Sequence, residues 1–215
     1  MAAVAGAATL PASAAPTGRL VPRGERVAGR TYLEWQVAAW QWQLGNLIIP
    51  RGGPNPTFCA IAGQTAPVWF LGASFNTRNS VTGACAIPAG RFILVASPDI
   101  VCSTVEPPPF HATTDAGLRR CARAGWRSAR ARHAVTLDGV ALRPPGFVVA
   151  TPAFSFTMPG NDNYLNVPGI TGGRAAAFGY ADMLRPLRPG RHTLVRVTRY
   201  AGGPPKRTTW YLVVA

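Results

Sequence analysis

Eight carboxylates and three histidines are the side chains with which this chain of 215 residues could perform acid–base chemistry. About half of the carboxylates have an immediate structural explanation, because they stand where a helix or a turn is expected. Those left for general acid or base catalysis are Asp99, Glu106, Asp162 and Asp182. A secreted hydrolase would combine Asp162 or Asp182 with His111. Nothing in their spacing brings these residues together, so we assign no catalytic residue and keep the hydrolase as an alternative.

Nucleophilic catalysis, metal binding and cofactor binding have little support in the sequence. The chain has no G-x-S-x-G elbow and no glycine-rich phosphate loop between a strand and a helix. His111 could activate a serine such as Ser103, although a histidine that follows three prolines is most simply a surface loop residue. No two cysteines have the short C-x-x-C spacing of a zinc site. We therefore expect no metal cluster and no cofactor.

A polar segment after the middle of the chain is a candidate binding loop. Its short amides and carboxylate could hydrogen-bond the hydroxyls of a sugar while an aromatic ring stacks on it, or could supply oxygen ligands to calcium. Tyr180 and Asp182, which come later in the chain, could join this loop if the loops gather at one end of the domain. The candidate ligand-binding residues are Asn161, Asp162, Asn163, Tyr164, Tyr180 and Asp182. An ordinary turn has the same composition, because Asx side chains bond to their own backbone.

The formal net charge is +14, and the cationic side chains are 21 arginines and one lysine. Four of the arginines, Arg119, Arg123, Arg127 and Arg130, follow one another at spacings of four, four and three, which places them along one side of a helix. Such a stripe would attract an anionic envelope polymer through long-range electrostatics. A solvated helix face explains the same spacing, and a GC-rich genome would explain the excess of arginine. We expect no specific recognition of nucleic acid.

Four cysteines, Cys59, Cys85, Cys102 and Cys121, indicate an oxidising compartment. Of the three possible pairings, the sequential one (Cys59 with Cys85, Cys102 with Cys121) closes the shortest loops and is the one we predict. Each bridge would contribute on the order of 3 kcal/mol. The alternative is a set of four buried free thiols in an intracellular protein.

The N-terminus supports export. Residues 1–15 are rich in alanine and end in Ala12-Ser13-Ala14, a small-x-small pattern that a signal peptidase accepts, so we interpret them as the remnant of an export signal. Residues 16–30 combine Pro, Gly and Arg and are predicted to be a flexible lead-in. Residues 31–215 are then a single domain. The chain has no run of about 18 apolar residues, so we predict no transmembrane helix. We expect an exported protein that is extracellular, periplasmic or associated with the cell envelope.

Two helices should flank the rest of the fold. Thr31 and Glu34 form a capping-box pattern, and the helix that begins there should end at Gly45 in a left-handed conformation. Its three tryptophans could stack on a carbohydrate, but core packing explains them better. A second helix should run from Asp115 towards Arg130, capped by Thr113 or Thr114.

The remaining segments are predicted to be strands. Residues 68–71 and 92–95 are continuous apolar runs, which is typical of central strands covered on both faces. Asp138-Gly139 predicts a tight hairpin turn, and residues 193–197 and 209–214 should form a closing hairpin around Gly202-Gly203-Pro204-Pro205. The predicted fold is mainly β, a β-sandwich or jelly-roll-like core with one or two peripheral helices.

Several short motifs stand out along the chain. They include Gly63-Gln64 followed by Pro67-Val68-Trp69-Phe70-Leu71, the motif Cys85-Ala86-Ile87-Pro88-Ala89-Gly90, and Cys102-Ser103-Thr104-Val105-Glu106. These motifs resemble those of a family of uncharacterised exported bacterial proteins. The resemblance spans nearly all of residues 32–214 and implies export and the two sequential disulfides. It implies no activity. The chain departs from the family at residues 91–95, where similar proteins favour a lysine followed by an aromatic-proline run.

Overall fold

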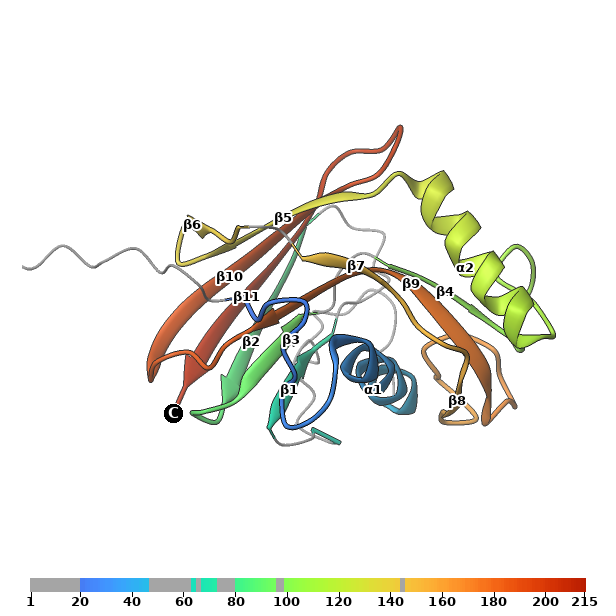
Figure 1. The fold of residues 1–215 in the computed structure, drawn as a ribbon, viewed down its shortest axis with the longest axis horizontal. Helices are drawn as coiled ribbons and strands as arrows, with labels where there is room; N and C mark the ends of the chain where they lie inside the picture. The colour runs from blue at the N-terminus through green and yellow to red at the C-terminus, as the bar shows by residue number, and fades with distance from the viewer. Residues whose placement is uncertain (1–19, 47–62, 65–66, 73–79, 96–98, 144–145) are drawn as a thin grey trace, which may run out of the picture.

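The computed structural model describes residues 20–46, 63–64, 67–72, 80–95, 99–143 and 146–215. Over these residues the chain is mainly β, with two helices and two mixed sheets (Figure 1). This confirms the predicted fold class of a β-rich core with few helices. The predicted export signal of residues 1–15 and the predicted disulfide partner Cys59 lie outside the described residues.

The first sheet is organised around one long strand, β9. Its six described strands are β1 (Val68–Leu71), β3 (Phe92–Val95), β4 (Asp99–Ser103), β7 (Phe147–Ala150), β8 (Phe154–Thr157) and β9 (Gly172–Leu184). Both β4 and β7 pair with Phe178 and Gly179 of β9, so they lie on opposite edges of that strand. Pairing is antiparallel except between β1 and β3. Because side chains alternate along β9, this strand contributes residues to the apolar clusters on both faces of the sheet.

The second sheet contains the two predicted hairpins. Its order among the described strands is β2 (Ser80–Ile87), β11 (Lys206–Val214), β10 (Gly190–Arg199), β5 (Arg132–Leu137) and β6 (Val140–Ala141). Asp138 and Gly139 connect β5 to β6, and both have positive φ angles, as a type I′ turn requires. β10 and β11 form the closing hairpin. Both hairpin predictions are confirmed.

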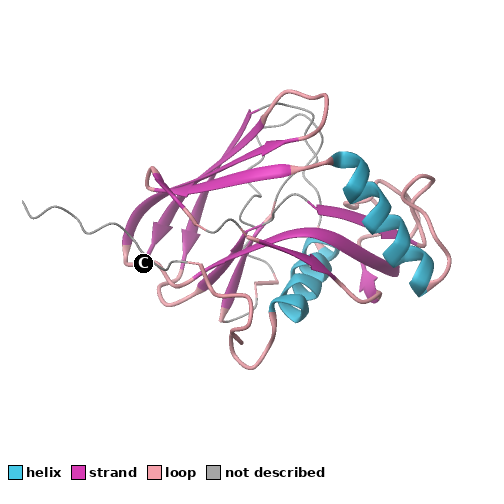
Figure 2. Cartoon of the chain, turned by 45° about the horizontal axis from the view of Figure 1, so that its top comes forward, coloured by secondary structure: helices cyan, strands magenta, loops and turns pink. Residues whose placement is uncertain are grey.

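The two faces of the first sheet are covered by different elements. Helix α1 (Tyr32–Gly45) packs on one face, where Trp35 meets Phe70 and Met183, and Trp40 meets Phe154. The other face packs on the second sheet at one end and on helix α2 (Asp115–Ala129) at the other. Figure 2 shows the two helices on either side of the long strand. Neither described helix has the length and apolar character needed to span a membrane.

Helix α1 begins as predicted. The Thr31 hydroxyl accepts a hydrogen bond from the backbone of Glu34, and the Glu34 carboxylate accepts one from the backbone of Thr31 at 2.6 Å. Trp35 and Trp40 are buried, which confirms core packing of these tryptophans. The helix ends at Gly45 as predicted, but the expected left-handed conformation is wrong, because Gly45 does not have a positive φ angle and the C-cap Asn46 has an extended backbone.

Helix α2 also begins as predicted and is bonded to the first sheet. Thr114 is its N-cap, and a disulfide joins Cys121 of the helix to Cys102 of β4, with a Cα–Cα distance of 6.1 Å. Gly125 faces Ile100 of the same strand so closely that a Cβ atom there would lie 2.9 Å from the Ile100 Cγ2 atom. The helix therefore packs tightly on the strand. Cys85 of β2 is disulfide-bonded as well.

Residues 20–30 differ from the predicted flexible lead-in. Val21 and Val27 are buried, and the Val21 amide donates a hydrogen bond to the Met183 carbonyl at 2.8 Å. The Trp35 indole donates one to the Val27 carbonyl at 2.9 Å. This part of the segment is therefore ordered against β9 and α1, because two isolated valines reach the core despite their Pro- and Gly-rich surroundings.

The strand at residues 68–71 is not central among the described strands. β1 pairs with β3 and ends the sheet order, whereas β3 lies between β1 and β9. Both faces of β1 are nevertheless buried, as the apolar run predicts. The Gln64 side chain exchanges two hydrogen bonds with the Phe70 backbone, at 2.8 and 2.9 Å. The Gly-Gln motif that carries the family resemblance therefore has a structural role beside this strand.

Candidate functional site

The polar loop before β9 is held in place by its own side chains. Asn163 is 3% exposed; its amide nitrogen donates to the Val167 carbonyl at 2.9 Å, and its amide oxygen accepts from the Val167 amide at 3.1 Å. Tyr164 packs edge-on against Trp40 of α1, and burial raises its pKa well above the ordinary value. Asn161 and Asp162 are exposed. Two of the four loop candidates thus have structural roles.

Tyr180 and Asp182 lie on the opposite face of the first sheet from this loop. Tyr164 belongs to the core under α1, whereas Tyr180 packs against Trp126 of α2 at a ring distance of 5.1 Å. Asp182 shares the face of Tyr180, because it is the second residue after Tyr180 in β9 and side chains alternate along a strand. The sheet therefore separates the six predicted ligand-binding residues into two groups, and they form no single site.

His111 and Asp182 of the hydrolase alternative are also apart. His111 forms a β-bridge with Ser103, which is paired with Ala175 of β9. Asp182 lies seven residues further along that strand, which places it about 20 Å from His111. The Ser103 hydroxyl donates to the Glu106 carboxylate at 2.9 Å, and burial raises the pKa of Glu106 to about 7. Ser103 and Glu106 thus organise a half-buried turn.

A histidine–aspartate pair that sequence reasoning missed connects the two sheets. The His133 Nε2 atom of β5 lies 2.8 Å from the Asp182 Oδ2 atom of β9, and the two side chains are 0% and 1% exposed. The Tyr180 ring lies against the imidazole, with a centroid distance of 4.0 Å. No spacing rule finds this pair, because 49 residues separate its members in the sequence.

Arg196 is a further buried charged residue, and Asp99 is a half-buried one. Arg196 of β10 is 9% exposed, donates to the Thr208 hydroxyl at 3.2 Å and lies over the Trp210 ring. Burial raises the pKa of Asp99 to about 7, although Trp40, Arg196 and Gln36 favour its ionised form. Within the described part of the chain, no three His, Cys, Asp or Glu side chains gather in a way that could hold a metal ion.

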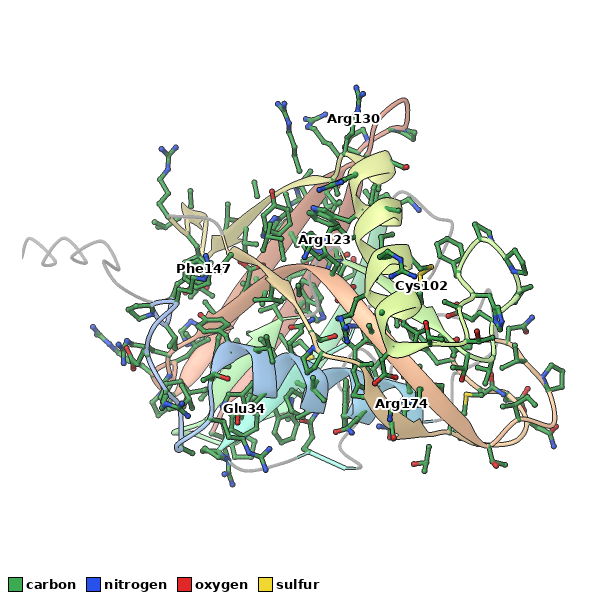
Figure 3. The ribbon with its side chains drawn as sticks, turned by 45° about the vertical axis from the view of Figure 1, so that its right-hand side comes forward. Glu34, Cys102, Arg123, Arg130, Phe147 and Arg174 are labelled. Carbon is green, nitrogen blue, oxygen red and sulfur yellow. A yellow bond between two sulfur atoms is a disulfide. The ribbon has the colours of Figure 1, made fainter. Side chains whose placement is uncertain are left out.

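The arginine stripe is present and exposed. We call Arg119, Arg123, Arg127 and Arg130 the basic surface; all four are exposed. The Arg123 guanidinium also lies over the Phe178 ring of β9, 5.2 Å from its centroid. Figure 3 shows Arg123 on the helix and Arg130 where the helix passes into β5. Arg130 is the C-cap of α2 and has a left-handed backbone. It therefore lies just after the helix and is not part of the helical stripe itself.

Most of the carboxylates are bonded to partners outside the basic surface. Asp115 shares the α2 helix but is held by Arg174 through two hydrogen bonds of 2.6 and 2.7 Å. Asp162 is the exposed carboxylate of the polar loop. The others bond elsewhere: Glu25 to Arg185, Glu34 to Thr31, Asp99 to Gln36 and Trp40, Glu106 to Ser103, Asp138 to His192, and Asp182 to His133. No ion pair within the described residues involves the basic surface.

Two further arginines lie beside the basic surface and escaped the sequence assignment. Arg132, the first residue of β5, is the direct neighbour of Arg199 in β10, and both are exposed. The Ala201 amide donates to the Ala129 carbonyl at 3.1 Å, so the turn after β10 adjoins the end of α2. The alternation of side chains along residues 190–199 could have indicated that Arg199 is exposed. Its pairing with Arg132 follows only from the register of β10 with β5.

Comparisons with known proteins identify no family. No protein-family model and no curated protein matches the chain. Among solved structures, PbICP-C in complex with falcipain-2 covers 69% of this chain and 98% of its own, at 12% identity and a TM-score of 0.28. Amebosin covers 63% and 96%, at 12% identity and a TM-score of 0.20. Scores this low do not establish a common fold, so nothing is carried over from either protein.

Proposed function

We propose that this protein is an exported, non-catalytic domain that binds an anionic polymer of the bacterial cell envelope through the basic surface of α2. The observation that carries the proposal is the separation of charge. Four arginines are exposed on one helix and its cap, while seven of the eight carboxylates are bonded to groups outside this surface. Asp115 lies one turn before Arg119 on α2 and interacts with it electrostatically, but its hydrogen bonds go to Arg174. A surface with this excess of positive charge attracts a polyanion.

Export is proposed on three grounds. The Cys102–Cys121 disulfide is compatible with an oxidising compartment. The small-x-small pattern at Ala12-Ser13-Ala14 resembles the end of a leader. The motifs around Gln64 and Cys85 resemble those of exported bacterial proteins. Fusing the chain to a reporter enzyme that becomes active only outside the cytoplasm tests this part, and an inactive fusion would contradict it.

Binding is tested with two soluble polyanions, poly(glycerol phosphate) and polyglutamate, across a range of salt concentrations. We expect binding that weakens steeply as salt rises, because association releases counterions. The triple variant Arg119→Gln, Arg123→Gln, Arg127→Gln should lower the slope of log K against log salt by about 2 to 3. Binding that is independent of salt would refute the proposal.

A charge-matched control separates a local site from the net charge. Arg23, Arg188 and Arg191 are exposed and lie on other elements, so replacing all three by glutamine removes the same charge without touching α2. We expect this control variant to keep most of the affinity. Equal losses in the two triple variants would mean that the basic surface is not the site.

A further inference from the structure

Arg132 and Arg199 are two like charges placed side by side on neighbouring strands. They are directly opposite residues at the end of the antiparallel β5–β10 ladder, so their Cβ atoms are about 5 Å apart. Both side chains are exposed, and they lie on the outer face of the second sheet, because the next residues inward, His133 and Thr198, are directed to its buried face. Like charges in this arrangement repel each other.

Within the part of the chain that the structure describes, no carboxylate compensates the charge of these two arginines. Arg127 and Arg130 stand at the C-terminal end of α2, where a positive charge stabilises the helix dipole. Arg132 and Arg199 lie in strands, which carry only a small net dipole. No ion pair within the described ranges involves either of them, and seven of the eight carboxylates have partners elsewhere. A bound anion would remove the repulsion.

We infer that Arg132 and Arg199 together bind one phosphate diester group, so that the polymer recognised by the basic surface is a phosphodiester chain. A phosphate diester has two free oxygens that point in different directions, and each can accept hydrogen bonds from one guanidinium group. A carboxylate has both oxygens in one plane, which one guanidinium fork satisfies. Two guanidinium groups side by side on neighbouring strands therefore favour phosphate.

The neighbouring arginines extend this site along the polymer. Arg130 is two residues before Arg132 at the junction of α2 and β5, and Arg207 of β11 pairs with Val197, which places it diagonally across from Arg199. A flexible chain bound between Arg132 and Arg199 could thus continue onto the basic surface. This inference rests on the proposed function, since it names the ligand class and adds the residues that select it.

The experiment compares poly(glycerol phosphate) with polyglutamate of equal charge at one ionic strength. Arg132→Gln and Arg199→Gln should each lower the affinity for poly(glycerol phosphate) about tenfold, and the double variant should lose little more, because two groups that share one phosphate are not additive. Polyglutamate binding should change much less. Arg191→Gln, on the same strand and the same exposed face, is the matched control and should have little effect.

Without any polymer, each single variant should have a Tm about 1 to 3 °C higher than the wild-type protein, because the repulsion is gone. If the affinity losses of the two single variants multiply in the double variant, or if the wild-type protein binds the two polymers equally well, Arg132 and Arg199 do not share one phosphate. The proposed function would still stand. Unchanged binding in both single variants, together with loss of binding in the α2 triple variant, would also show that Arg132 and Arg199 do not bind the phosphate. Absence of binding to either polymer by the wild-type protein would remove both.

Discussion

His133 and Asp182 form a buried contact of 2.8 Å between the two sheets, whereas His192 and Asp138 form a contact of the same length at the surface. The first pair joins β5 to β9 where the interface of the sheets changes from apolar to polar. The second joins β10 to the hairpin turn after β5. The two pairs thus offer the same chemistry at two degrees of burial.

Replacing His133 by leucine should destabilise the fold far more than replacing His192 by leucine. His133→Leu removes a hydrogen-bond partner from a carboxylate that is 1% exposed, which costs about 2 to 4 kcal/mol of unfolding free energy. His192→Leu should cost less than about 1 kcal/mol, because Asp138 is 38% exposed and can bond to water. Urea unfolding of both variants measures the difference, and similar losses would show that the buried pair does not join the sheets.

Asp99 should make the protein less stable as the pH rises. Burial raises its pKa from 3.8 to about 7, so between these values the folded state binds a proton that the unfolded state has released. The unfolding free energy contributed by this group therefore falls with rising pH across the window, by at most about 1.4 kcal/mol per pH unit, and is constant above pH 7.

The variant Asp99→Asn removes this titration and can keep the hydrogen bonds from Trp40 and Gln36 through its amide oxygen. We expect it to be more stable than the wild-type protein at pH 8, by about 1 to 2 kcal/mol, and to show a flatter stability profile between pH 4 and 7. Glu106 titrates in the same window, so Glu106→Gln should flatten the profile further. An unchanged profile in Asp99→Asn would refute this assignment.

The features that the sequence predicted correctly are those set by neighbours in the chain. Thr31 and Glu34 begin α1 through contacts between residues three apart, and Asp138-Gly139 forms its turn from two residues. Thr114 caps α2 for the same reason. Local chemistry is sufficient in each case, because no distant residue is needed to satisfy the backbone.

The features that it missed depend on register between distant strands. Arg132 and Arg199 become neighbours only once β5 is aligned with β10, and His133 meets Asp182 only across two sheets. Tyr164 and Tyr180 were expected in one site, but the loop packs under α1 while β9 directs Tyr180 to α2. A shift of one residue in either strand would reverse the faces, and composition does not determine it.

The Cys102–Cys121 disulfide should contribute about 3 kcal/mol to the unfolding free energy, because it closes a loop over a sequence separation of 19 residues. The double variant Cys102→Ser, Cys121→Ser tests this without reducing the disulfide of Cys85. Amide hydrogen exchange should accelerate first in α2, which loses its covalent bond to β4. An exchange pattern that changes uniformly along the chain would show that the bridge does not act locally on the helix.

Gly125 should resist the substitution that normally improves a helix. In an exposed helix interior, Gly→Ala gains about 1 kcal/mol. Here the added Cβ would lie 2.9 Å from Ile100 Cγ2, so the Ile100 side chain or the helix must move. We expect Gly125→Ala to gain nothing and Gly125→Val to lower the unfolding free energy by about 1 to 3 kcal/mol. Ala124→Gly, at the neighbouring exposed position, is the control and should cost about 1 kcal/mol. A Gly125→Ala variant that is stabilised by the full amount would mean that α2 is not held tightly against β4, and the basic surface would then lack a rigid support.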